Sequence, residues 1–145
     1  MKTLKSKYHK SQWDRRNVVA LPIKDLWASV PKAEKYRGKD FYGPVMEDIK
    51  QNGLTFPLLV VDATRAQIIE QKEKHKDRLC DLPFDKDSDL TLRQYVIWGG
   101  SNRVRIAEEL GYTHIDCVIF PNGDFATPHN KQGLHSKPYR KKFYG

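Results

Sequence analysis

The stretch that decides the fold of this chain is Tyr95-Val-Ile-Trp-Gly-Gly-Ser-Asn-Arg-Val-Arg-Ile-Ala-Glu-Glu-Leu-Gly111. It opens with an uninterrupted run of aromatic and β-branched side chains, which is typical of a strand covered on both faces. Gly99 and Gly100 then allow the backbone to turn sharply. From Ser101, a good N-cap, apolar residues recur at helical spacing up to Gly111. The stretch therefore predicts a strand, a glycine turn and a helix.

The start of this helix is a predicted anion site. Free backbone N–H groups and the positive end of the helix dipole meet there and favour a bound phosphate. Arg103 lies in the first helical turn, where a cation opposes the dipole at a cost of about 0.3–1 kcal/mol. A bound phosphate would reverse that effect, whereas without one Arg103 is an ordinary solvated arginine, and the sequence leaves both interpretations open. The residues predicted to hold a phosphate or nucleotide are Gly99, Gly100, Ser101, Asn102, Arg103 and Arg105.

Three blocks of the sequence, taken in order, resemble the ParB/sulfiredoxin superfamily. Gly100-Ser-Asn-Arg-Val-Arg-Ile-Ala107 is similar to the family's G-x-x-R-x-R-x-A box. Val45-Met-Glu-Asp-Ile-Lys-Gln-Asn-Gly-Leu-Thr-Phe-Pro-Leu-Leu-Val-Val61 resembles the preceding box, where a short helix ends in Gly-Leu and a proline introduces a strand. Val18-Val-Ala-Leu-Pro-Ile-Lys-Asp-Leu26 matches the opening strand and its turn. The resemblance implies an α/β (α+β) domain over residues 17–120, with a small mixed sheet and packed helices.

Departures from the superfamily narrow the function that the resemblance implies. Sulfiredoxins carry a reactive cysteine and a histidine in this turn, where this chain has Ser101 and Asn102, so thiol repair is not expected. Chromosome-partitioning ParB proteins have a glutamine before the proline, where this chain has Phe56, and a more arginine-rich box. The resemblance therefore favours the small single-domain members, which include ParB-like nucleases and nucleotide-using enzymes, and a phage origin is compatible with so compact a chain.

Charge is distributed unevenly along the 145 residues. The net charge of +8 divides into +5 for residues 1–16, +4 for residues 121–145 and −1 for the rest. Cations neutralise phosphates and aromatic rings stack on bases, so both ends are predicted to be basic arms that bind DNA, single strands included. Solubilising tails and contacts with an acidic protein are the alternatives. The predicted nucleic-acid-binding residues are Lys7, Lys10, Trp13, Arg15, Arg16, Lys137, Arg140, Lys141 and Lys142.

The remaining sequence predicts a single domain. Hydrophobic patterning indicates strands near 17–22, 58–62, 93–98 and 115–120, and helices near 41–52, 64–79 and 101–110, followed by a turn at 121–124 where the chain leaves the core. Because no run of 18 apolar residues exists, no membrane partner is expected, and the predicted location is the cytoplasm, of the host if the protein is viral. Cys80 and Cys117 are predicted to be reduced and structural, with Cys117 in a strand.

Phosphodiester cleavage also needs an acidic residue that holds a metal or activates water. The family layout brings the helix before Gly53, which carries Glu47 and Asp48, close to the glycine turn, and Asp62 is a third candidate.

The leading hypothesis is a metal-dependent ParB-like DNA nuclease using Mg²⁺ or Mn²⁺, with Glu47, Asp48 and Arg103 as catalytic residues. The second is a CTPase, ATPase or small-molecule kinase that holds a nucleoside triphosphate at the same turn. The third is a non-catalytic module that binds nucleic acid or a host protein. The sequence leaves the metal ligands and the oligomeric state open.

Overall fold

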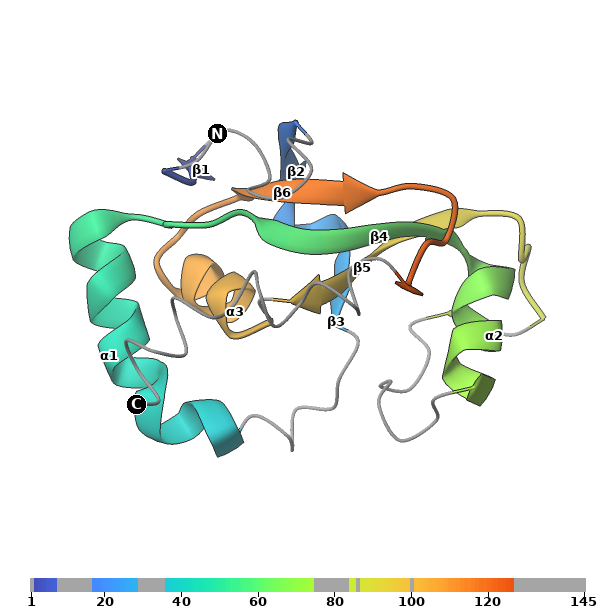
Figure 1. Ribbon diagram of the computed structural model, residues 1–145, viewed down its shortest axis with the longest axis horizontal. Coiled ribbons are helices and arrows are strands. Elements are labelled where there is room, and N and C mark those ends of the chain that lie inside the picture. Colours follow the sequence, from blue (N-terminus) through green and yellow to red (C-terminus); the bar gives the residue numbers. More distant parts are fainter. Residues whose placement is uncertain are drawn as a thin grey trace.

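The computed structural model describes residues 2–7, 17–28, 36–74, 84–85, 87–99 and 101–126. Within these ranges a mixed sheet of six strands is combined with three α-helices, which confirms the predicted α/β class (Figure 1). The elements are β1 (Thr3–Leu4), β2 (Val18–Pro22), the 3₁₀ turn η1 (Ile23–Asp25), β3 (Leu26–Ala28), α1 (Tyr36–Asn52), β4 (Leu58–Thr64), α2 (Arg65–Lys74), β5 (Arg93–Gly99), α3 (Ser101–Glu109) and β6 (His114–Phe120).

The sheet is organised around β4, which pairs antiparallel with β5 and parallel with β6. β3 lies beside β5 in parallel, and β2 pairs antiparallel along one edge of β6. Because a strand has only two edges, β1 and β4 share the other edge of β6. In the β4–β5 pair Leu59 lies opposite Gly99, so β4 begins where β5 ends. The predicted glycine turn therefore lies at the same end of the sheet as the chain segment that leads into β4.

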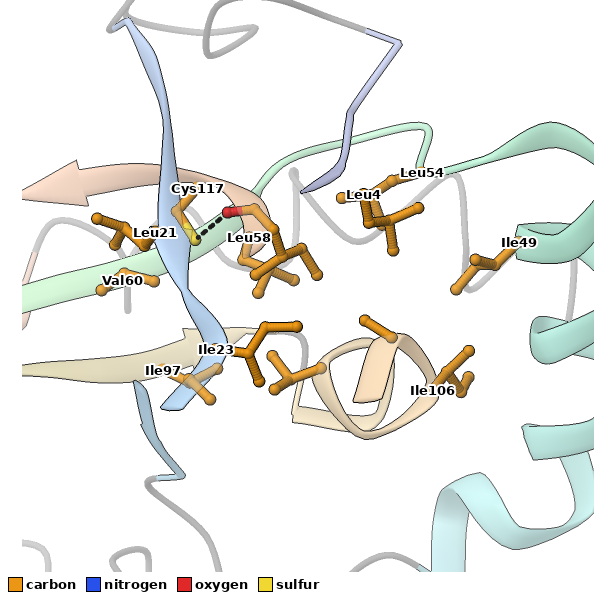
Figure 2. Packing of buried hydrophobic residues seen from close by; sticks show 13 residues of the cluster. Leu4, Leu21, Ile23, Ile49, Leu54, Leu58, Val60, Ile97, Ile106 and Cys117 are labelled. Carbon is orange, nitrogen blue, oxygen red and sulfur yellow. Dashed lines mark hydrogen bonds between the residues drawn. The ribbon is translucent and has the colours of Figure 1, made fainter. Parts of the chain in front are cut away.

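Side chains alternate between two hydrophobic clusters on opposite faces of the sheet. Leu58 and Val60 face the cluster that joins the sheet to α1 and α3, and Figure 2 shows this cluster from close by. Leu59 and Val61 face the second cluster, which joins the sheet to α2. All four side chains are fully buried. Coverage of both faces explains why this strand is a continuous apolar run rather than an alternating one.

The first residues belong to the sheet, and the prediction of a basic arm over residues 1–16 is wrong for residues 2–7. β1 pairs in parallel with the start of β6, and Leu4 is only 2% exposed. Ser6 is also buried, and its backbone N–H donates to Oδ2 of Asp116 at 2.8 Å. The predicted boundary failed because a two-residue strand among lysines has no hydrophobic periodicity; its pairing partner lies elsewhere in the chain.

The chain also returns to the core after β6, although it was predicted to leave the fold at Pro121. The predicted turn at 121–124 is present, and the N–H of Gly123 donates to the carbonyl oxygen of Asp62 at 2.9 Å. Phe125 then packs against Trp98, with ring centroids 5.6 Å apart, and is 7% exposed. The core therefore extends at least to Phe125, and the predicted C-terminal tail lies outside the described residues from 127 onward.

Several other element boundaries differ from those predicted. α1 begins at Tyr36 rather than near 41, because Gly43 and Pro44 are weak helix formers that conceal the first turns. β3 was not predicted, since three residues are too few to show a pattern. α2 is described as far as Lys74, and the remainder of the helix predicted over 64–79 lies outside the described residues.

Candidate functional site

The predicted strand, glycine turn and helix are the local structure of the candidate site. β5 ends at Gly99 and α3 begins at Ser101, so the helix starts immediately beyond the end of the sheet. The first N–H groups of a helix have no acceptor within the helix, which makes this position suited to an anion. Gly100 lies outside the described residues, as do the side chains of Ser101 and Asn102.

Arg103 is half-buried at this turn and has a defined contact. Its Nη1 donates a hydrogen bond of 2.8 Å to the carbonyl oxygen of Phe56, in the segment between α1 and β4. Its positive charge also acts on the thiol of Cys117 in β6. The side chain therefore reaches from the start of α3 to the start of β4 and holds these two elements together. The sequence left two interpretations of Arg103 open, a solvated side chain and a phosphate-binding one. Neither interpretation predicted the hydrogen bond to Phe56.

Arg105 does not join Arg103 at the site. Two residues along an α-helix correspond to a rotation of about 200°, which places the two side chains on opposite sides of α3. Arg105 is exposed, and its Nε lies 3.7 Å from Oε1 of Glu109, one turn later on the same helix. An exposed pair of this kind is worth about 0.3–0.5 kcal/mol, so Arg105 is oriented only weakly.

The helix that carries the two predicted acidic residues, α1, packs against α3. The two acids differ in their surroundings. Asp48 is 8% exposed and accepts a hydrogen bond of 3.0 Å from Nδ2 of Asn52. Glu47 is exposed, with Oε1 3.4 Å from Nζ of Lys50. Of these two acids, Asp48 is therefore the one shielded from solvent.

The two carboxylates do not form a metal site with each other. Adjacent helical residues project about 100° apart, which agrees with the different burial of Glu47 and Asp48. Asp62 is engaged elsewhere, because Nε of Arg93 donates to its Oδ1 at 2.8 Å. Within the part of the chain that the structure describes, no three His, Cys, Asp or Glu side chains are grouped so as to hold a metal ion. Mg²⁺ commonly takes only one or two protein carboxylates together with water and substrate phosphate, so the Mg²⁺ or Mn²⁺ of the nuclease hypothesis stays a prediction.

Among families and curated proteins, nothing matches this sequence. The resemblance to the ParB/sulfiredoxin superfamily consequently rests on the three sequence blocks, beside the coarser α/β class that the structure shows. None of the described helices is long and apolar enough to cross a membrane.

Asp116 is a structural carboxylate that sequence reasoning missed. It lies 9% exposed in β6 and accepts two hydrogen bonds from Ser6, one from the backbone N–H at 2.8 Å and one from Oγ at 3.3 Å. The available signal was an acidic residue inside an otherwise apolar strand. Lys7, the residue after Ser6, is also bonded: its backbone N–H donates to the carbonyl oxygen of Leu54 at 2.7 Å. The N-terminal segment is therefore attached both to β6, through Asp116, and to the segment between α1 and β4, through Leu54.

Lys7 is the one predicted nucleic-acid-binding residue that falls within the described ranges, and its side chain is exposed. The others lie outside the described residues, and these are Lys10, Trp13, Arg15, Arg16, Lys137, Arg140, Lys141 and Lys142.

An open depression lies at the opposite end of β5 from the glycine turn, with a volume of about 370 Å³. Seven residues of extended strand separate the two positions, or roughly 20 Å. Its arginines have partners within the protein, since Arg93 bonds Asp62 and Nε of Arg65 donates to Oε1 of Gln94 at 3.1 Å. The depression is thus a separate feature, in which Arg93 is paired with a carboxylate and Arg65 bonds a neutral amide. Its lining consists of Lys24, Asp25, Arg65, Arg93, Gln94 and Tyr95.

Cys117 is buried and free, as predicted. Its Sγ donates to the carbonyl oxygen of Ile115 at 3.3 Å (Figure 2). Burial raises the pKa of the thiol from its ordinary value of 9.0 to about 12; the negative charge of Asp116 adds to this and the positive charge of Arg103 opposes it. Because the thiolate is the reactive form, a structural role fits Cys117 better than a chemical one.

This raised pKa predicts a dependence of stability on alkaline pH. The unfolded thiol ionises near pH 9 and the folded one near pH 12, so the stabilisation is complete below the lower value and is lost as pH rises toward the higher one. Urea unfolding across this range is expected to show a steeper loss for the wild type than for Cys117→Ala. Parallel pH profiles for the two proteins would contradict the assignment.

Proposed function

We propose that this protein is a ParB-like domain that binds DNA and holds one backbone phosphate at the start of α3. The observation that carries the proposal is the placement of Arg103, a half-buried guanidinium fixed by the carbonyl of Phe56 beside a helix N-terminus. A helix N-terminus attracts anions, and a guanidinium whose orientation is already set loses little entropy when it adds a phosphate contact. A solvated arginine would need no such attachment.

Cleavage of the bound strand is the enzymatic form of this proposal. The candidate residue is Asp48, because α1 packs against α3 and Asp48 is the more shielded of the two acids predicted there. Its role would be to accept the proton of the attacking water, with its carboxylate positioned by Asn52. Glu47, exposed beside Lys50, is the less suited of the two acids.

The binding proposal is tested with fluorescently labelled DNA and two arginine variants. Arg103→Ala is expected to weaken binding by roughly ten- to a hundredfold, because a hydrogen bond between charged groups contributes about 1.5–3 kcal/mol. Arg105→Ala is the matched control, with the same change of charge on the opposite side of α3, and a change of less than about threefold is expected. Equal losses for the two variants would reject a phosphate site at the turn.

Arg103→Ala also removes the bond to Phe56, so its folding must be checked by thermal denaturation before binding is compared. Arg103→Lys provides a second readout. Lysine keeps the charge but lacks the planar donor geometry of arginine, so it should restore part of the affinity. Full loss in both variants at unchanged folding would still support the site, whereas full binding by Arg103→Ala would exclude it.

The enzymatic form is tested by incubating plasmid and single-stranded DNA with the protein, with and without Mg²⁺ or Mn²⁺. Cutting that disappears in Asp48→Asn and persists in Glu47→Gln is expected if Asp48 is the base. Nucleoside triphosphates, added as competitors, report whether the same turn prefers a free nucleotide. Binding without cutting would leave a non-catalytic DNA-binding domain.

A further inference from the structure

We infer that the depression at the start of β5 binds a small phosphate monoester, with Arg65 as the anchor of the phosphate group. The depression has a volume of about 370 Å³, and pockets for small molecules usually measure about 300–1,000 Å³. The inference goes beyond the proposed function, because the depression lies at the other end of β5 from the glycine turn and has different lining residues.

Three cations from separate parts of the chain meet at this depression. Lys24 belongs to η1, Arg93 is the first residue of β5, and Arg65 is the first residue of α2. The sheet brings these positions together, since Arg93 lies opposite Thr64 in the β4–β5 pair, and β3, which follows η1, is the other neighbour of β5. Among the lining residues only Asp25 is acidic. A hollow lined mainly by one sign of charge attracts the opposite sign, so the lining favours an anion.

Arg65 is half-buried, and its guanidinium is held by neutral groups. Nε donates to Oε1 of Gln94 at 3.1 Å, and Nη1 donates to Oγ of Ser88 at 2.8 Å. The guanidinium carbon lies 4.9 Å from the centroid of the Phe84 ring, a distance at which a cation and a ring attract each other. These contacts fix the guanidinium without neutralising its charge. Within the ranges that the structure describes, Nη2 of Arg65 forms no hydrogen bond, so this nitrogen can donate to a ligand.

The acidic groups around these cations have other partners. Asp62 accepts from Nε of Arg93 at 2.8 Å. Asp89 accepts from Oγ1 of Thr91 at 2.6 Å and from its backbone N–H at 2.9 Å. These bonds are the main cause that lowers the pKa of Asp89, and the charge of Arg65 is the smallest cause. Among the described residues no carboxylate forms an ion pair with Arg65, which leaves its charge available to a bound anion.

A phosphate monoester fits this arrangement better than a carboxylate does. It carries about two negative charges near neutral pH and has three terminal oxygens, whereas a carboxylate has one charge and two oxygens. Arg65 presents a fixed guanidinium to one oxygen, and Lys24 presents an exposed, flexible ammonium to another. The remainder of the ligand is expected to be polar, because Gln94 and the phenol of Tyr95 complete the lining.

The inference is tested by titrating the isotope-labelled full chain in a nuclear magnetic resonance experiment. Inorganic phosphate and adenosine monophosphate are the probes, and acetate is the carboxylate for comparison. Saturable backbone shifts are expected at residues 24–25, 65 and 93–95, with acetate binding more weakly. Shifts confined to residues 101–104 would overturn the inference and support the phosphate site of the proposed function. The absence of saturable shifts, or equal affinity for acetate, would also overturn it.

Variants assign the cations. Arg65→Ala is expected to weaken phosphate binding roughly tenfold or more, as for other hydrogen bonds between charged groups. Because this change also removes the bonds to Gln94 and Ser88, Lys24→Ala provides an independent measurement. Lys24 is exposed, so its loss should weaken binding about threefold and leave the melting temperature unchanged. Lys74→Ala, the same change of charge at the last residue of α2, is the matched control. Equal effects of the two lysine variants would reject the site.

Discussion

Replacing Leu4 with alanine is expected to lower the free energy of unfolding by about 2–5 kcal/mol, the range measured when large apolar residues in protein cores are truncated. Leu4 is 2% exposed and packs in the cluster that joins the sheet to α1 and α3. The substitution removes buried apolar surface and leaves a cavity between β1 and its neighbours. Chemical denaturation followed by circular dichroism measures the loss directly.

Lys5→Ala is the matched control, since Lys5 is the next residue and its side chain is exposed. Its effect should stay within about 0.5 kcal/mol. If Leu4→Ala were as harmless as Lys5→Ala, residues 2–7 would not be part of the core, and the arm predicted over residues 1–16 would be restored.

Gly123→Ala is expected to destabilise the protein by about 2–4 kcal/mol, for two reasons that add together. Gly123 has φ +68°, a left-handed conformation that side chains disfavour, and a Cβ there would lie 2.5 Å from Cδ of Gln67. Gln67 cannot move away without loss. Its Oε1 accepts from the N–H of Thr64 at 2.9 Å and its Nε2 donates to the carbonyl of Asn122 at 3.2 Å. Urea unfolding of the purified variant tests the expectation.

Two other glycines separate these causes. Gly111 has φ +85°, but a Cβ at this position would meet no heavy atom within 4 Å, so Gly111→Ala should show the conformational cost alone, about 1–2 kcal/mol. Gly43 lies inside α1 with open space around it, but Pro44 follows it and its ring disfavours a helical residue with a Cβ at the preceding position, so Gly43→Ala should gain less than the roughly 0.5–1 kcal/mol usual for this change in a helix. A loss at Gly123 no greater than the loss at Gly111 would show that the Gln67 contacts contribute nothing.

The parts of the fold that could be predicted are those whose signal is local. β4 and β5 are apolar because both faces of the sheet are covered, and α3 begins at Ser101, directly after the glycine pair, and ends shortly before Gly111. β1 and β3 could not be predicted, because strands of two and three residues acquire their structure from the partners beside them. The same reasoning explains Phe125, whose burial depends on a turn that directs it back to Trp98.

The candidate site also contains features that a local sequence pattern predicts and features that depend on tertiary packing. The position of Arg103 at a helix start follows from the sequence, but its bond to Phe56 depends on how α3 packs against the start of β4, and no periodicity encodes that arrangement. Asp48 and Glu47 are adjacent in sequence, yet packing buries only one of them. The sequence pattern therefore indicates which residues to consider for a site and leaves open which of them already have structural partners.

The pairing of β1 with β6 has a consequence for synthesis on the ribosome. The backbone N–H of Lys2 donates to Oγ1 of Thr113, 111 residues away, and the strands that follow these residues pair in parallel. Leu4 and Ser6 must therefore stay exposed until nearly the whole domain has been translated. Such distant contacts slow folding. A partner that captured the nascent N-terminus would delay closure of the sheet, and a bulky fusion placed there would compete for the same edge of β6.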